Sequence, residues 1–178
     1  MRPKRARDVK LAVSLVAADE GLFMRAIEAL SSRFGQMDFL SETSPFDRTD
    51  YYEEEFGGGL KRRFVSFEDL VPPDGGGLAQ IKLFTNGVED EFLAPGGKRR
   101  INIDPGIVSL ERFVLATCKN FTHRIYLKDG VWADLTLIYT ARGFKDLPWT
   151  YPDYRVDVMK SWLRQIRARY ARQISKGQ

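Results

Sequence analysis

The sequence is poor in the residues that hold small folds together through covalent bonds or metal ions. Among 178 residues there is one cysteine, Cys118, and one histidine, His123. A lone cysteine has no partner in the chain for a disulfide, and these two side chains fall short of the four ligands of a structural zinc site. The fold therefore depends on a hydrophobic core, which a chain of this length is able to build.

Long hydrophobic runs are also missing. No stretch of about 18 apolar residues is present to span a bilayer, and the first eight residues, MRPKRARD, lack the apolar core of a signal peptide. We therefore expect a cytoplasmic protein without a membrane span. The expected organisation is a basic, disordered leader over residues 1–8, followed by a single α+β domain over residues 9–178.

The glycine motifs of nucleotide-binding sites are absent as well. The P-loop needs G-x-x-x-x-G-K-[ST], but Gly97-Lys98 is followed by arginine, and Phe92 stands where the first glycine belongs. No G-x-G-x-x-G occurs for a dinucleotide. The sequence thus predicts neither a P-loop nor a dinucleotide site, and it leaves any cofactor unidentified.

Charge is plentiful but segregated along the chain. Residues 1–10 carry a net charge of +4, residues 11–97 carry −9 and residues 98–178 carry +9, which gives +4 in total. Such a distribution is typical of two halves of one domain that attract each other, and also of a basic face that binds phosphates. The sequence leaves both explanations open.

Hydrophobic periodicity predicts alternating strands and helices in the first half. Residues 9–16 show the period-2 pattern of a buried strand, and Asp19 then precedes a helix whose apolar residues run from Phe23 to Phe34 and which ends at Gly35. The later elements expected in this half are a strand at 37–41, a loop at 44–50, a strand at 60–67 and a helix whose apolar residues run from Leu78 to Phe92.

The second half is expected to contain a strand, a helix, a hairpin and a terminal helix. The strand covers residues 98–104 and stops at Pro105-Gly106, and Ser109 caps a helix that extends through Thr117. Asp129-Gly130 is a strong hairpin signal between strands at 123–128 and 131–140. Apolar residues from Val156 to Ile174 recur at the spacing of a long amphipathic helix.

This order of elements favours the α+β class, with helices packed on a mixed or antiparallel sheet. The β-α-β-β-α-β beginning predicts a ferredoxin-like core, extended by the C-terminal hairpin and the long amphipathic helix. The alternative is a three-layer α/β fold, in which the turn at Asp104-Pro-Gly106 follows a strand and forms a binding loop.

Candidate site residues lie at strand ends and turns, where sites are commonly built. Asp104 and His123 are the candidate catalytic residues, because carboxylate and imidazole groups act as general acids and bases. Basic side chains suited to anions, and aromatic residues suited to pocket walls, provide the candidate ligand-binding residues. These are Arg62, Arg100, Lys119, Arg124, Tyr52, Trp149, Tyr151 and Arg155.

No metal site is predicted by ligand spacing. A metal-assisted hydrolysis is conceivable only if folding brings the carboxylates of Glu53, Glu54 and Glu55 to Asp104. The spacing of these residues along the chain does not indicate that it does.

Seven segments together resemble a bacterial family classified as a domain of unknown function, DUF4416. They are YYEEEFG at 51–57, LKRRF at 60–64, IKLFTN at 81–86, RINIDPG at 100–106, ATCK at 116–119, HRIYL at 123–127 and PWTYPDYR at 148–155. The resemblance spans residues from about 9 to 172. It implies no established activity; some members are labelled GTP-binding proteins, but TCKN at 117–120 is not the guanine-reading N-K-x-D motif.

Three functions remain open from the sequence. The first is a binding protein or small enzyme for an anionic or phosphate-bearing small molecule, and enzymatic activity itself is undecided. The second is an RNA or ribonucleoprotein-binding module that uses the basic leader and the C-terminal helix. The third is a protein-interaction domain without a ligand, and the oligomeric state cannot be read from the sequence.

Overall fold

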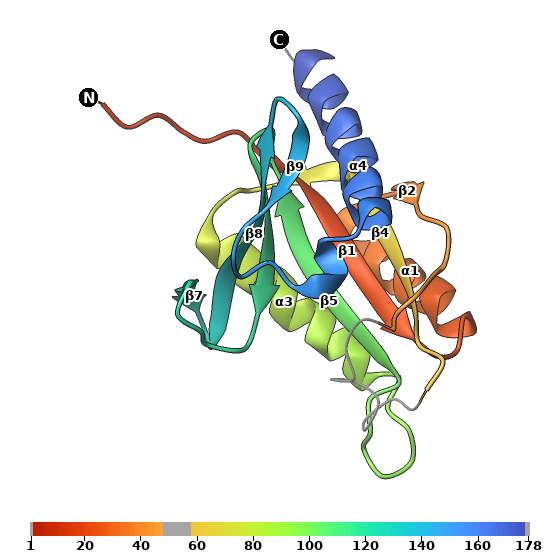
Figure 1. The fold of residues 1–178 in the computed structure, drawn as a ribbon. Helices are drawn as coiled ribbons and strands as arrows, with labels where there is room; N and C mark the ends of the chain where they lie inside the picture. Colours follow the sequence, from red (N-terminus) through yellow and green to blue (C-terminus); the bar gives the residue numbers. More distant parts are fainter. Residues whose placement is uncertain (1, 48–57, 177–178) are drawn as a thin grey trace.

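The computed structural model describes residues 2–47 and 58–176. Its strands are β1 (Val9–Ala17), β2 (Met37–Leu40), β3 (Ser44–Pro45), β4 (Lys61–Val71), β5 (Ile101–Val108), β6 (Arg112–Thr117), β7 (Arg124–Lys128), β8 (Val131–Thr140) and β9 (Gly143–Asp146). Its helices are α1 (Gly21–Phe34), α3 (Gly75–Asp90), the short 3-10 helix η2 (Pro152–Tyr154) and α4 (Asp157–Lys176). Figure 1 shows their arrangement. None of the helices in these residues is both long and apolar enough to cross a membrane.

The described strands form one antiparallel sheet in the order β2-β4-β1-β5-β6-β8-β7, with β3 paired to β4 and β9 paired to β8. The part β2-β4-β1-β5, with α1 and α3 as its connecting helices, has the strand order of a ferredoxin-like fold. The predicted α+β class is confirmed. The alternative α/β fold is not, because it needs parallel strands.

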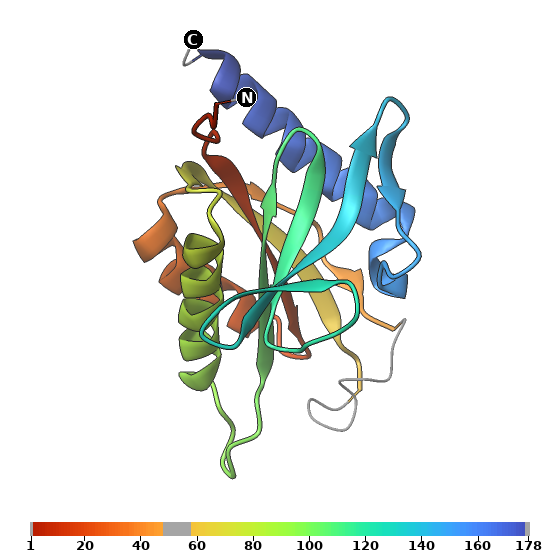
Figure 2. The same ribbon diagram turned by 90° about the vertical axis from the view of Figure 1, so that its left-hand side faces the viewer.

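Helices lie on both faces of the sheet, as Figure 2 shows. On one face α1 and α3 pack against a core that includes Leu11, Val13 and Leu15 of β1. On the other face α4 packs its apolar residues against Phe64 of β4 and Phe113 of β6. Because both faces are covered, every residue of β1 is buried.

Local signals predicted several elements correctly. Helix α1 ends at Gly35, whose φ of 82° places it in the left-handed region that favours glycine. The β7–β8 hairpin turns at Asp129-Gly130, where both φ angles are positive, 52° and 78°, as in a type I′ turn. The long helix expected after residue 156 is α4.

The helix predicted from Ser109 to Thr117 is wrong, because this segment forms β6. The backbone N–H of Ser109 bonds to the carbonyl of Arg112, so Ser109 belongs to the turn between β5 and β6 instead of capping a helix. Phe113 and Leu115 both enter the core beneath α4. The apolar spacing that predicted a helix also occurs in strands that are buried on both faces. The pairing of this segment with β8 makes it a strand.

The strand predicted to stop at Pro105-Gly106 continues to Val108. Pro105 lies opposite Val13 within the ladder, and Gly106 is not among the residues with positive φ. The sequence analysis also missed β9 and η2, and it assigned the β3 residues to a loop.

Candidate functional site

The site begins where β5 and β6 separate. These strands pair only from Gly106 to Val108, so that no strand among the described residues pairs with the first part of β5 on this edge. Two side chains of α3 take the place of a neighbouring strand at Ile103. Glu89 accepts the Ile103 N–H through Oε1 at 2.6 Å, and Lys82 donates to the Ile103 carbonyl at 2.9 Å. The backbone N–H and C=O groups of Ile103 would cost free energy if they were buried without partners, and both are thus hydrogen-bonded.

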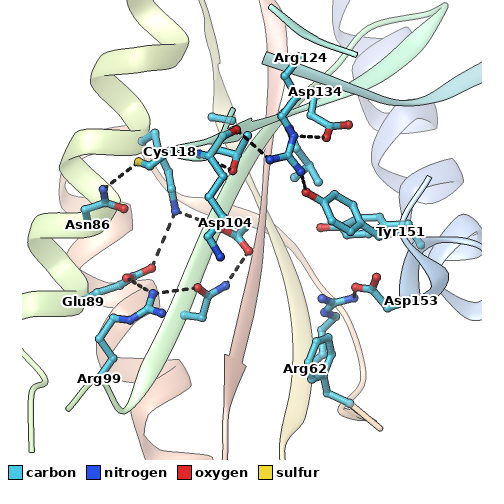
Figure 3. A pocket seen from close by; sticks show the side chains of 18 of the residues that line it. Arg62, Asn86, Glu89, Arg99, Asp104, Cys118, Arg124, Asp134, Tyr151 and Asp153 are labelled. Carbon is cyan, nitrogen blue, oxygen red and sulfur yellow. Dashed lines mark hydrogen bonds and ion pairs between the residues drawn. The ribbon is translucent and has the colours of Figure 1, made fainter. Parts of the chain in front are cut away.

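The gap between these strands opens into a cavity of about 660 Å³. Figure 3 shows α3 with Asn86 and Glu89 on one side, Tyr151 and Asp153 on the other, and Asp104 between them. The described part of the lining contains five cationic side chains and five carboxylates. Its volume lies within the range of roughly 300–1,000 Å³ that is usual for small-molecule sites.

Asp104 is held ionised at the centre of the cavity. Lys82 donates to its Oδ1 at 3.0 Å and Asn102 to its Oδ2 at 2.6 Å. Burial alone would raise the pKa of Asp104, but the charge and hydrogen bond of Lys82, with the hydrogen bond of Asn102 and the charge of Arg62, hold that pKa below its ordinary value. Burial likewise opposes the charge on Lys82, and Asp104 and Glu89 raise the pKa of Lys82 above its usual range.

A second buried carboxylate, Asp134, anchors the opposite wall. Its Oδ2 lies 3.0 Å from both Arg124 Nε and His123 Nε2, and its side chain is only 1% exposed. Arg124 also donates to the carbonyl of Lys119 at 2.8 Å and to the hydroxyl of Tyr151. Arg124 and Tyr151 are therefore fixed in place at the cavity wall.

Arg62 is the most unusual group in the cavity. Its guanidinium lies between two aromatic rings, with Cζ 4.4 Å from the centre of the Phe46 ring and 5.1 Å from that of Tyr154. Its Nη1 lies 2.5 Å from Asp153 Oδ2 as an ion pair. The residue is 3% exposed, and Asp153 takes only Nη1, so that Nε has no hydrogen-bond acceptor among the described residues. A buried guanidinium with open donors is costly unless something accepts from them.

Two buried hydroxyls lie on the same side of the sheet as Arg62. The Tyr154 hydroxyl and Ser14 Oγ interact with each other, and no other partner is recorded for either among the described residues. Burial raises the pKa of Tyr154 well above its ordinary value, so its phenol stays protonated and is a donor. A protonated phenol and a buried cation thus lie together at one end of the cavity.

Strand register explains why these groups lie together. Val16 of β1 is flanked by Arg62 of β4 and Asn102 of β5. Two residues earlier, Ser14 is flanked by Phe64 and Asp104. Residues two apart on a strand share a face, so the polar groups of three adjacent strands point to the same side of the sheet.

Five of the predicted site residues line the cavity. They are Asp104, Arg62, Lys119, Arg124 and Tyr151. Burial and the neighbouring charge of Arg124 lower the pKa of Lys119. Tyr52 and the carboxylates Glu53–Glu55 lie outside the described residues, and among the described ones no group of three metal-ligating side chains gathers.

The remaining predicted residues lie outside the cavity lining. His123 stacks on Trp149 with ring centres 5.0 Å apart, and Trp149 donates to the carbonyl of Leu135. Arg100 forms an ion pair with Asp19, and Arg155 donates to the carbonyls of Thr150 and Pro148. His123 reaches the site only through Asp134, which it shares with Arg124.

Sequence reasoning missed Lys82, Glu89, Asp134 and Asp153. A signal existed for the first two, because Leu78, Lys82, Thr85 and Glu89 recur at helical spacing on the buried face of α3. Charged residues on an apolar helix stripe need partners. The two aspartates carried no comparable signal, since their partners come from distant parts of the chain.

Comparison with known proteins gives one match. A family model described as Domain of unknown function (DUF4416) covers residues 7–170. No curated protein and no solved structure matches the chain.

Proposed function

The chain belongs to the DUF4416 family, whose description names no activity, and we propose from its cavity that it binds a small molecule carrying one phosphate or a comparable anionic group. The single observation that carries this proposal is Arg62. Its guanidinium is buried and stacked between Phe46 and Tyr154, with Nη1 paired to Asp153 and Nε lacking a hydrogen-bond acceptor among the described residues. Phosphate and carboxylate oxygens are the acceptors that fit a guanidinium edge.

The charge of the lining supports a ligand of low charge. Its cationic side chains and carboxylates are equal in number among the described residues, and most of the cations are already paired, as in Lys82–Asp104 and Arg124–Asp134. A triphosphate would lie against a lining that has no excess of positive charge, and it would lack the glycine-rich loop that usually holds it. A monophosphate needs only the open Nε donor of Arg62 and the phenol of Tyr154 beside it.

The size of the cavity supports a ligand larger than phosphate alone. Beyond Arg62 the lining offers the amides of Asn86 and Asn102, which donate to and accept from hydroxyl groups, and the carboxylate of Asp104, which accepts from them. The aromatic rings of Phe46 and Tyr154 are occupied by Arg62. A sugar phosphate therefore suits these walls better than a nucleotide, whose base needs a free ring for stacking.

Isothermal titration calorimetry with inorganic phosphate, glucose 6-phosphate and GTP tests the proposal. We expect glucose 6-phosphate to bind more tightly than phosphate, and GTP to bind least well. Arg62→Lys keeps the charge but loses the planar edge, so we expect affinity for the sugar phosphate to fall by about tenfold or more, as the loss of a charged hydrogen bond costs roughly 1.5–3 kcal/mol.

Arg33→Lys is the matched control. Arg33 also stacks on two aromatic rings, Phe34 and Phe84, but it belongs to α1 on the other side of the sheet. The control should bind with unchanged affinity. Equal binding by the Arg62→Lys protein, or no heat with any singly phosphorylated probe, would contradict the proposal.

Tyr154→Phe is expected to change binding more than stability. The substitution removes a buried hydroxyl whose one recorded polar partner in the described part of the chain is Ser14. The unfolding free energy of the free protein should therefore change by no more than about 1 kcal/mol, while affinity for glucose 6-phosphate falls severalfold. Urea denaturation and calorimetry measure the two effects. A variant that loses stability while keeping its affinity would show that the hydroxyl serves the fold instead of a ligand.

A further inference from the structure

A second charged feature lies at the end of the molecule where residues 2–8 meet the C-terminal end of α4. Figures 1 and 2 show both segments, with the β8–β9 turn, at the same end. The Tyr170 hydroxyl donates to the carbonyl of Asp8 at 2.9 Å. Arg5 and Arg7 line a shallow hollow together with Gln173 and Ile174 of α4. Segments from opposite ends of the sequence thus form one surface.

This surface carries eight exposed cations and is called the basic end below. They are Arg2, Lys4, Arg5, Arg7, Arg142, Arg164, Arg172 and Lys176. None of them forms an ion pair with a residue in the described ranges. Most cations of the cavity, in contrast, are neutralised by a neighbouring carboxylate. Unpaired cations gathered from three segments create a positive potential that attracts a polyanion.

The other arginines of α4 are used to hold the helix on the sheet. Arg167 lies over the Tyr139 ring at 3.5 Å, and it donates to the carbonyl of Leu110. Arg169 lies over the ring of Phe39 and donates to the carbonyl of Asp38. The arginines left exposed are therefore a distinct set, and the helix that presents them is fixed in place.

Burial of the apolar side of α4 argues against a membrane as the partner. Trp162, Leu163 and Ile166 lie in the core against the sheet. A membrane-surface helix needs such residues free to enter the bilayer interface. Among the described residues, the large exposed hydrophobic side chains of α4 are confined to Val158 in its first turn, and residues 2–8 contribute none.

The same distribution indicates how a nucleic acid would be bound. The exposed aromatic residues of the described ranges, on which bases could stack, are Phe121, Tyr126 and Trp149, and none of them belongs to the segments of the basic end. The 20 residues of α4 extend for about 30 Å, close to one turn of a duplex. We infer that the basic end binds the phosphodiester backbone of a nucleic acid without reading its sequence.

Fluorescence anisotropy with a labelled RNA duplex of about 20 base pairs, and with the DNA duplex of the same sequence, tests this inference across a range of salt concentrations. We expect the logarithm of the binding constant to fall linearly with the logarithm of salt concentration, with a slope between about −4 and −7 for five to eight phosphate contacts. The RNA and DNA arms decide whether the 2′-hydroxyl contributes.

Two double variants each remove two positive charges, one pair from the basic end and one pair from elsewhere. Arg172→Gln with Lys176→Gln should weaken binding severalfold and make the slope shallower by up to about 2. Lys98→Gln with Lys128→Gln removes two exposed cations away from the basic end and should change neither. Arg62→Lys should also bind the duplex normally, because its cavity is a separate site.

Three results would overturn the inference. One is the absence of duplex binding at low salt. Another is equal weakening by the two double variants. The third is tighter binding to vesicles of phosphatidylserine than to either duplex, which would assign the basic end to a membrane surface.

Discussion

Lys82→Met is expected to destabilise the folded protein by about 3–5 kcal/mol, the cost of removing one partner from a buried ion pair. Methionine fills nearly the same volume but cannot donate a hydrogen bond. The substitution leaves the carboxylate of Asp104 without its cation and the carbonyl of Ile103 without its donor. Urea denaturation of the purified variant gives the change in unfolding free energy.

A matched control and a second substitution separate the ion pair from the packing of α3. Lys128 forms an exposed ion pair with Asp129, so Lys128→Met should change stability by less than about 0.5 kcal/mol. Adding Asp104→Asn to Lys82→Met removes the stranded charge and should recover part of the loss. A loss equal to the sum of the single effects would mean that the two side chains do not act as a pair.

The same cluster shows which part of the site was readable in the sequence. Lys82 and Glu89 lie on the apolar stripe of α3. That local pattern alone indicates buried charges that need partners. The identity of the partner, the open edge of β5 at Ile103, was not readable. It exists because β6 leaves β5 before this point, and the sequence analysis had assigned the β6 residues to a helix.

Arg62 illustrates the opposite case. The sequence marks it as a basic residue in a strand, one of three in succession, and it was predicted to bind an anion. What distinguishes it from Lys61 and Arg63 is its burial between Phe46 and Tyr154. These rings come from distant segments, and no local pattern predicts that they meet. Local periodicity therefore predicted most of the strands and helices, whereas the cavity depends on contacts between them.

The sequence analysis placed Gly106 in a turn that ends the strand, and its actual position leads to the second large effect. Gly106 lies within β5, opposite Leu115 of β6. A Cβ atom built on it would lie 2.5 Å from Cε2 of Phe113 and 2.8 Å from the carbonyl oxygen of Val114. Glycine is required because a ring and a backbone oxygen from β6 approach it closely.

Gly106→Ala should therefore destabilise the protein by about 2–3 kcal/mol, since a methyl group forced into a packed site displaces its neighbours. Gly87→Ala is the control, because Gly87 lies exposed within α3 with no atom within 4 Å of an added Cβ. Alanine there should stabilise the helix by up to about 1 kcal/mol. Thermal or urea unfolding of both variants measures the difference.

A second substitution at Phe113 tests where β5 and β6 come together. If Gly106 occupied a turn, alanine would cause backbone strain, and shortening the Phe113 side chain would not relieve it. In the strand, Phe113→Leu beside Gly106→Ala removes the closest ring atoms and should recover part of the lost stability. Because β5 and β6 first pair at Gly106, that recovery would fix the point from which the cavity opens.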